Sequence, residues 1–436
     1  MTSLRFEKIA TLIFVLAITH AFITPNLYIF SRKLAARKKK HPNKAKFYHF
    51  SSEVVYLLSE IEVVFGIWLI PLLLFFTMLE GFAPMLEYLN GRNYSYPLFI
   101  MVVVVVMGSR PIITFAERIL EFISRLGKDS PGSWWWTILT VGPILGALLK
   151  EPGAMTLCAI LLAKKFYQYK PSRSFQYATF ALLFANISVG GMLTSFSSRS
   201  LLIVAGTFKW DTPYMFMNFG WKALVGIVLA NAVYYMIFRK EFKTNFPKKL
   251  PTLEKDEQRR PVPFVITLVH LLFLTAIVLF SAYAPLFIGV FFLFLGFRQT
   301  TLFYQGDLHL KSAILVGFFF ASLLIHGELQ GWWIKPFLDS LSEFGALIAS
   351  FALSAFVDNA AIATFSLELS APEVAKQHAI ISGAMAAGAL TIVANVPNPI
   401  GLSILRESFH NKISFATLFL FALFPSFLFL TLFWLL

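Results

Sequence analysis

Continuous apolar runs of about twenty residues recur along the whole chain and are separated by short polar segments. A helix of about 20 residues crosses the ~30 Å hydrocarbon layer of a membrane, so each run predicts a spanning helix. The runs are unbroken, unlike the alternating strands of a transmembrane barrel. The predicted helices cover residues 8–30, 54–79, 95–116, 176–207, 218–238, 263–283, 285–298, 312–326, 376–404 and 413–436.

Two further apolar stretches, 134–163 and 337–367, are interrupted near their middles by polar residues. The first interruption is Lys-Glu-Pro-Gly at 150–153, and the second is Asp358-Asn359. The charges of the flanking segments predict how these stretches lie in the membrane, because Lys and Arg concentrate in cytoplasmic loops.

The segments 31–46 and 239–260 each carry eight basic residues and are predicted to be cytoplasmic. Loops 80–94, 208–217 and 327–336 hold one basic residue each and are predicted to face outward. Counting crossings between these segments places both ends of 134–163 inside and both ends of 337–367 outside. Each stretch is then a re-entrant hairpin, and the two hairpins point in opposite directions.

The predicted fold is therefore an all-α polytopic membrane protein with two inverted-topology repeats and about ten full spans. Both termini are expected outside, and residues 117–127 are predicted to lie along the membrane interface as an amphipathic segment. The predicted divisions are 1–53, an N-terminal helix and basic cytoplasmic segment; 54–238, the first transport repeat; 239–262, a basic cytoplasmic linker; and 263–436, the second transport repeat.

Each predicted repeat also contains a long apolar helix with an expected break. Gly190 and Gly191 weaken the helix over 176–207. Pro397 and Pro399 interrupt the helix over 376–404, because proline lacks an N–H and clashes with the preceding turn. Broken helices in matched positions of two repeats are typical of the midplane site of a secondary transporter.

The composition agrees with a membrane protein, since 57% of residues are hydrophobic and 14% are charged, against about 25% charged in soluble domains. The net charge of +14 lies largely in the predicted cytoplasmic segments, so nucleic acid is not an expected partner. Cys158 is the only cysteine, which excludes an internal disulfide. The first apolar run lacks a small-residue cleavage site and predicts a retained helix.

Asp358 is the leading candidate for the transport site. An ionised Asp at the bilayer centre costs roughly 2.5–3.5 kcal/mol, and such residues usually have a function. Burial favours the neutral carboxyl and a bound cation favours the charged one, so one group can hold a proton and a cation in turn. The alternative is a helix N-cap without a transport role.

Glu151 is aligned with Asp358 at the other hairpin tip and is a second candidate for handling a cation or a proton. Asp358 and Glu151 are accordingly the candidate ligands of the metal cation. Glu151 could instead form a structural ion pair with Lys150 or Arg199. Lys150 could also pair with Asp358 and be displaced by sodium.

Neutral oxygen-bearing side chains lie beside both hairpin tips and both breaks, and hard cations such as sodium bind oxygen. Each could instead bond to its own helix. These candidates are Thr194, Ser195, Ser198, Asn359, Thr391, Asn395 and Asn398. A buried structural pair between Glu60 or Glu62 and Arg110 is also expected.

Four stretches resemble the sodium/proton antiporter family of the ion transporter superfamily and are similar to antiporters of the NhaD type. They are residues 148–163, 186–206, 354–369 and 386–405. In the NhaD type both hairpins carry Asp-Asn, whereas the first hairpin here carries Lys-Glu. The resemblance implies that the chain exchanges sodium, or a similar monovalent cation, for protons by alternating access.

A sodium- or proton-coupled transporter of dicarboxylates or oxyanions is the alternative function. Arg199, Lys150 and the N-termini of the half-helices favour an anion, whereas the acids at both tips do not. An enzyme is not expected, because no metalloprotease motif, nucleophile elbow or phosphate-binding loop is present. We expect no cofactor beyond the transported sodium and protons, inorganic cations and the lipid bilayer as partners, a homodimer as one option, and a bacterial inner membrane as the location.

Overall fold

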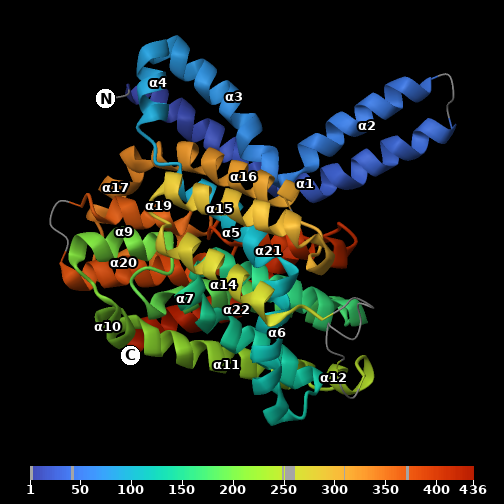
Figure 1. The fold of residues 1–436 in the computed structure, drawn as a ribbon. Coiled ribbons are helices and arrows are strands. Elements are labelled where there is room, and N and C mark those ends of the chain that lie inside the picture. Colours follow the sequence, from blue (N-terminus) through green and yellow to red (C-terminus); the bar gives the residue numbers. More distant parts are fainter. Residues whose placement is uncertain (1–2, 41–43, 248–249, 251–260, 309, 370–372) are drawn as a thin grey trace.

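The computed structural model describes residues 3–40, 44–247, 250, 261–308, 310–369 and 373–436. All regular structure in these residues is helical, which confirms the predicted all-α class (Figure 1). The helices before the predicted linker are α1 (Leu4–Lys40), α2 (Ala45–Ser59), α3 (Ile61–Glu80), α4 (Phe82–Asn90), α5 (Ser95–Met107), α6 (Arg110–Ser124), α7 (Pro131–Lys165), α8 (Arg173–Gly190), α9 (Arg199–Phe208), α10 (Thr212–Met215) and α11 (Trp221–Phe238), and the short α12 (Glu241–Thr244) lies within the linker.

The helices after the predicted linker form the rest of the bundle. They are α14 (Phe264–Leu279), α15 (Ala284–Thr300), α16 (Leu310–Glu328), α17 (Gly331–Asp339), α18 (Glu343–Ser354), α19 (Asn359–Ser366), α20 (Val374–Ala386), α21 (Asn398–Leu405) and α22 (Phe415–Leu435). Half of the predicted linker, residues 248–249 and 251–260, lies outside the described residues.

Seven helices in the described residues are long and apolar enough to cross a membrane, or up to eight if the bent pair of α5 and α6 is one span. Four shorter apolar helices accompany them. The expectation of about ten full spans is therefore not confirmed, although the repeated apolar helices themselves are.

The N-terminal region differs from the prediction. The basic segment 31–46 was expected to be a loop, but α1 runs to Lys40 and α2 packs along it as a projecting helical hairpin (Figure 1). At 37 residues α1 is about 55 Å long, which exceeds the thickness of a membrane. The predicted helix 54–79 is divided at Glu60, whose extended backbone separates α2 from α3.

Two predicted outward loops also contain helices. Loop 80–94 holds α4, which buries Met85, and loop 327–336 holds the start of α17, which buries Ile334 and Leu338. These apolar residues recur at helical spacing, so each short segment can bury one face against the bundle.

The predicted helix 95–116 bends by 72° between α5 and α6. Gly108 ends α5, Ser109 is extended, and Pro111 stands in the first turn of α6. Because proline cannot continue a preceding helix, the amphipathic helix begins at Arg110 and not at residue 117.

The stretch 134–163 folds back on itself within α7, as predicted for a hairpin. Lys150 has φ 61° and ψ 154°, which is not helical. Cys158 Sγ lies 3.7 Å from the carbonyl oxygen of Ile138, and a Cβ on Gly142 would be 2.2 Å from that sulfur. In a straight helix residues 142 and 158 would be about 24 Å apart. The two halves of α7 are therefore antiparallel neighbours.

Both long helices that were expected to break are broken. The first divides into α8 and α9, with irregular backbone at residues 194–198. The second divides into α20 and α21, with irregular backbone at residues 390–397. Pro399 lies in the first turn of α21, where its missing N–H costs nothing.

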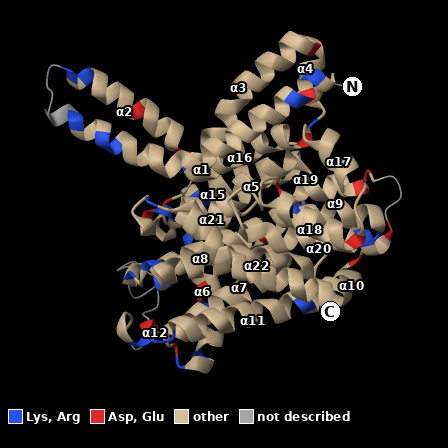
Figure 2. Ribbon diagram, turned by 180° about the vertical axis from the view of Figure 1, so that it is seen from behind, with Lys and Arg blue, Asp and Glu red and all other residues tan. Residues whose placement is uncertain are grey.

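Charge is distributed unevenly over the molecule (Figure 2). Many Lys and Arg residues gather at the free end of the α1–α2 hairpin and around α6 and α12, whereas the N- and C-terminal ends lie on the other side. This distribution agrees with the predicted orientation, in which basic segments are cytoplasmic and both termini are outside.

Candidate functional site

The tip of the first hairpin is bonded to the first broken helix. The main-chain N–H of Glu151 donates to the carbonyl oxygen of Ser197 over 3.2 Å. Thr194 Oγ1 donates to the carbonyl oxygen of Ala147 over 3.0 Å. Irregular backbone at a break leaves N–H and C=O groups without helical hydrogen bonds. The two bonds described here pair some of these groups within the protein.

The second half repeats this arrangement. The main-chain N–H of Asn359 donates to the carbonyl oxygen of Ala394 over 3.2 Å. Thr391 Oγ1 donates to the carbonyl oxygen of Ala355 over 2.5 Å. In each half the threonine of the break donates to a carbonyl oxygen four residues before the tip residue. The N–H of that tip residue donates to a carbonyl oxygen three residues after the threonine.

This matched bonding sets the register between the halves. Glu151 corresponds to Asn359, and Lys150 corresponds to Asp358, because both pairs of hydrogen bonds require it. The alignment of Glu151 with Asp358 is thus wrong by one residue. The predicted alignment pairs the two acidic residues, whereas the main-chain hydrogen bonds pair residues at the same place in the two hairpins.

Asp358 lies at the start of α19 and is 8% exposed. Its side chain makes no capping hydrogen bond to the helix, and its Oδ1 has no hydrogen-bond partner among the described residues. A buried polar atom left in this state costs free energy unless something binds it. Asp358 lines a small space of about 20 Å³, and Arg199 lines it too.

Glu151 is 1% exposed and lies against the first break. A Cβ on Gly191 would be 2.3 Å from Glu151 Oε1, so only glycine leaves room for the carboxylate. That oxygen, like Asp358 Oδ1, has no hydrogen-bond partner in the described part of the chain. Glu151 and Asp358 stand at the two hairpin tips, whose main chains are bonded to the two breaks, so both acids belong to the same region.

Lys150 is buried beside these acids and donates from Nζ to the carbonyl oxygen of Phe196 over 2.9 Å. Within the described residues no ion pair joins it to Glu151 or Asp358. Its ammonium is bonded to the backbone of the first break. The two ion pairs considered for it from the sequence are not formed in this structure.

Amide side chains connect the two halves at the crossing. Ser200 Oγ donates to Asn359 Oδ1 over 2.8 Å, and Asn359 Nδ2 donates to Asn395 Oδ1 over 3.1 Å. Asn398 Nδ2 donates to the carbonyl oxygens of Gly388 and Thr391. Asn359, Asn395, Asn398 and Thr391 are therefore brought together with the acids, as are Thr194 and Lys150.

Other predicted residues are placed differently. Ser198 caps α9 by accepting from the N–H of Leu201. The hydroxyl of Ser195 contacts that of Thr212 at the start of α10, with 3.2 Å between the oxygens. A Cβ on Gly190 would lie 2.8 Å from the carbonyl oxygen of Pro143, so this glycine permits α8 to cross α7 closely.

Pro397 immediately precedes α21 and marks the end of the second break. The broken helices touch upstream of it, since Ser188 Oγ donates to the carbonyl oxygen of Met385 over 2.8 Å. Both expected breaks are therefore parts of one crossing point.

The expected pair between Glu60 or Glu62 and Arg110 is wrong. Arg406 forms the pair, with its guanidinium 2.6 Å from Glu60 Oε2 and 3.6 Å from Glu62 Oε1. Arg110 begins α6 beyond the bend and donates to the carbonyl oxygen of Tyr304. Arg110 follows the 72° bend between α5 and α6, and the prediction of a continuous helix over 95–116 did not take this bend into account.

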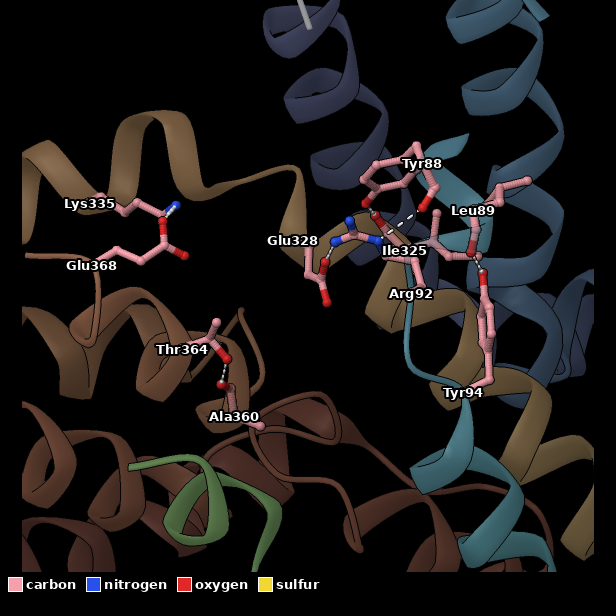
Figure 3. Close-up of polar contacts among 10 residues, drawn as sticks. All are labelled: Tyr88, Leu89, Arg92, Tyr94, Ile325, Glu328, Lys335, Ala360, Thr364 and Glu368. Atoms are coloured by element: carbon pink, nitrogen blue, oxygen red, sulfur yellow. Dashed lines mark hydrogen bonds and ion pairs between the residues drawn. The ribbon is translucent and has the colours of Figure 1, made fainter. Parts of the chain in front are cut away.

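The sequence interpretation also missed a set of polar residues around α4, α17 and the end of α16. Arg92 and Glu328 form an ion pair there, and Lys335 pairs with Glu368 (Figure 3). The sequence signal for this set is the acidic residues of the two predicted outward loops, Glu80 and Glu87 in 80–94 and Glu328 in 327–336.

Apolar helices, a hairpin and two broken helices meeting at buried acids define an integral membrane protein of the class that includes secondary transporters. The family model described as "Putative Na+/H+ antiporter" matches residues 5–436. The chain belongs to this family. Membership supports a multi-pass membrane transporter of cations and protons and confirms the family predicted from the motifs.

The structure of the YdaH transporter of Alcanivorax borkumensis, described as having an unusual topology, is similar at 14% identity and a TM-score of 0.37. The match covers 81% of this chain and 86% of that chain. A likeness this distant carries no argument about fold or activity. No protein of curated function matches the chain in sequence.

Proposed function

We propose that the chain exchanges sodium, or a similar monovalent cation, for protons by alternating access, in the manner of the NhaD type. Asp358 holds the cation and the proton in turn. The observation that carries this proposal is the unpartnered Oδ1 of a buried Asp358, a residue that lines a small space beside the two broken helices.

The size and chemistry of that space fit the proposal. A volume of about 20 Å³ exceeds the roughly 10–15 Å³ that one water molecule needs, so a single small cation with little or no water can be held. An isolated carboxylate is costly in such a place, and either a proton or a cation removes the cost. Competition between the two for one carboxylate couples their movements.

Glu151 is proposed as a second acid of the same site, which handles a proton or a cation next to Gly191. Its Oε1 and the Nδ2 of Asn395 both lack a hydrogen-bond partner among the described residues. Among the described residues no group of three or more His, Cys, Asp or Glu side chains gathers as it would around a metal ion. Main-chain carbonyls of the breaks would complete the oxygen ligands of a transported cation.

The wider setting is proposed as the inner membrane of a bacterium, with inorganic cations and lipid as partners and no cofactor. A homodimer is compatible with this proposal. The two inverted repeats would form the framework for alternating access, and the matched bonds from Thr194 and Thr391 support their relationship.

The test uses everted vesicles with a pre-formed pH gradient, reported by a fluorescent dye. Adding sodium should collapse the gradient in the wild type, and Asp358→Asn should abolish this response while the protein still inserts. The matched control is Asp211→Asn, because Asp211 caps α10 at the surface and asparagine caps almost as well. Full activity of Asp358→Asn would refute the role of this residue.

Transport of an anion is the second candidate, because Lys150 and Arg199 place two cationic side chains at the crossing. Proteoliposomes distinguish the two functions. Sodium-driven accumulation of a dicarboxylate, without sodium-dependent proton flux, would favour the anion transporter.

A further inference from the structure

A wide cavity opens on the side of the molecule that carries the N-terminus. It has a volume of about 980 Å³ and lies between α1, α3, α4, α17 and the end of α16. We call it the outer vestibule. Its lining includes six acidic residues against two basic ones, Arg92 and Lys335; the acids are Glu7, Glu80, Glu87, Glu328, Asp339 and Glu368. A cavity lined mainly by one sign of charge raises the local concentration of the opposite ion.

The outer vestibule adjoins the space that contains Asp358. Glu328 lines both of them, and the inner space is otherwise bounded by Arg199, by apolar residues of α16 and by the start of α19. Figure 3 shows Glu328 between Arg92 and the α19 segment that carries Ala360 and Thr364. A cation moving from the vestibule to Asp358 therefore passes Glu328.

An ion pair between Arg92 and Glu328 stands at this boundary (Figure 3). Both side chains are about one quarter exposed, at 25% and 27%. Arg92 also contacts Tyr88, because its Nε donates to the carbonyl oxygen of Tyr88 over 3.0 Å and its guanidinium lies 4.5 Å from the Tyr88 ring. Tyr88 in turn donates from its hydroxyl to the carbonyl oxygen of Ile325 in α16.

We propose that Glu328 is an outer binding site for the transported monovalent cation, at which the cation replaces Arg92 as the counter-ion. Leaving a half-buried carboxylate without a partner is costly, whereas exchanging one cation for another keeps its charge compensated. When the cation displaces Arg92 from Glu328, Arg92 keeps its contacts with Tyr88. The cation on Glu328 then lies at the edge of the inner space, which Asp358 also lines. This inference rests on the proposed cation/proton exchange.

The test measures sodium-dependent proton flux in proteoliposomes of known orientation, with sodium added at one face at a time. Glu328→Gln should raise the half-saturating sodium concentration at the vestibule face by about tenfold or more, because a charged ligand is lost. At the opposite face it should change by less than about twofold. Arg92→Gln should lower the value at the vestibule face, because a competing cation is removed.

The matched controls are Lys335→Gln and Glu368→Gln, because that ion pair lines the same vestibule but not the inner space. Both controls should leave the half-saturating concentration within about twofold. Equal effects at both faces, or effects of Glu328→Gln no larger than those of Glu368→Gln, would overturn the proposal. If Glu328→Gln does not fold, as judged by size-exclusion chromatography, an unchanged value in Arg92→Gln overturns it.

The outcome is separable from that for the proposed function. Loss of exchange in Asp358→Asn together with a normal Glu328→Gln protein rejects only the outer site. Full exchange in Asp358→Asn rejects the proposed function, whatever Glu328 does.

Discussion

Lys150 and Asp358 occupy equivalent backbone positions in the two hairpins but carry opposite charges. The ammonium of Lys150 is bonded to the carbonyl oxygen of Phe196 in the first break, so its charge has a fixed partner. Asp358 Oδ1 has no hydrogen-bond partner in the described residues. We therefore expect a mobile cation or proton to exchange at Asp358, while Lys150 keeps its place on the backbone.

Gly191 provides the sharpest residue-scale prediction. A Cβ there would lie 2.3 Å from Glu151 Oε1, so Gly191→Ala should displace the carboxylate. Such crowding costs about 1–3 kcal/mol, and we expect the sodium-dependent proton flux to fall about tenfold or more. The measurement is the rate of dequenching in everted vesicles at matched protein levels.

Gly206→Ala is the control for this substitution, because a Cβ there meets nothing within 4 Å. It should transport as the wild type does and be slightly more stable, since alanine favours a helix by roughly 1 kcal/mol over glycine. Equal activity of the two variants would mean that the position of Glu151 against Gly191 does not matter for exchange.

At the scale of elements, the fold-back of α7 is the feature on which the first half of the site depends. Its two half-helices pack so closely that a Cβ on Gly142 would lie 3.8 Å from Cys158 Cβ. This separation is close to the mean of about 3.8 Å for disulfides. Cys158 is the only cysteine in the chain, so the background for a crosslink is clean.

Gly142→Cys should therefore form an intramolecular disulfide with Cys158 under mild oxidation. The measurement is mass spectrometry of peptides after free thiols are alkylated, with and without reductant. Gly206→Cys should stay unlinked under the same conditions, because nothing lies within 4 Å of that position. A straight helix over 131–165 would separate residues 142 and 158 by about 24 Å and give no crosslink.

At the scale of the whole molecule, the orientation in the membrane follows from the charge distribution in Figure 2. Glu87 of α4 and Lys46 of α2 are both exposed and lie on sides that we expect to be separated by the membrane. A membrane-impermeant maleimide should label Glu87→Cys in intact cells and Lys46→Cys only in inverted vesicles.

The wild-type protein is the blank for this labelling, because Cys158 is buried. Labelling of both substituted cysteines from the same side would contradict the predicted orientation. It would also place the outer vestibule on the wrong side for the cation path proposed above.

The sequence alone determined that the long apolar runs are helical, where two of them break and which polar residues stand at the hairpin tips. The reason is that lipid offers no hydrogen bonds, so an apolar run must satisfy its backbone internally as a helix. Gly190, Gly191, Pro397 and Pro399 act on their own segments, and local effects of this kind can be predicted without knowing the fold.

The tertiary structure alone decided the register of the halves, the partner of Glu60 and the outer vestibule. Lys150 became the counterpart of Asp358 through main-chain bonds to the two breaks, and Arg406 reached Glu60 across 346 positions of sequence. Arg92 and Glu328 meet only because α4 packs against the end of α16. Contacts between distant segments depend on packing, which no local pattern of residues encodes.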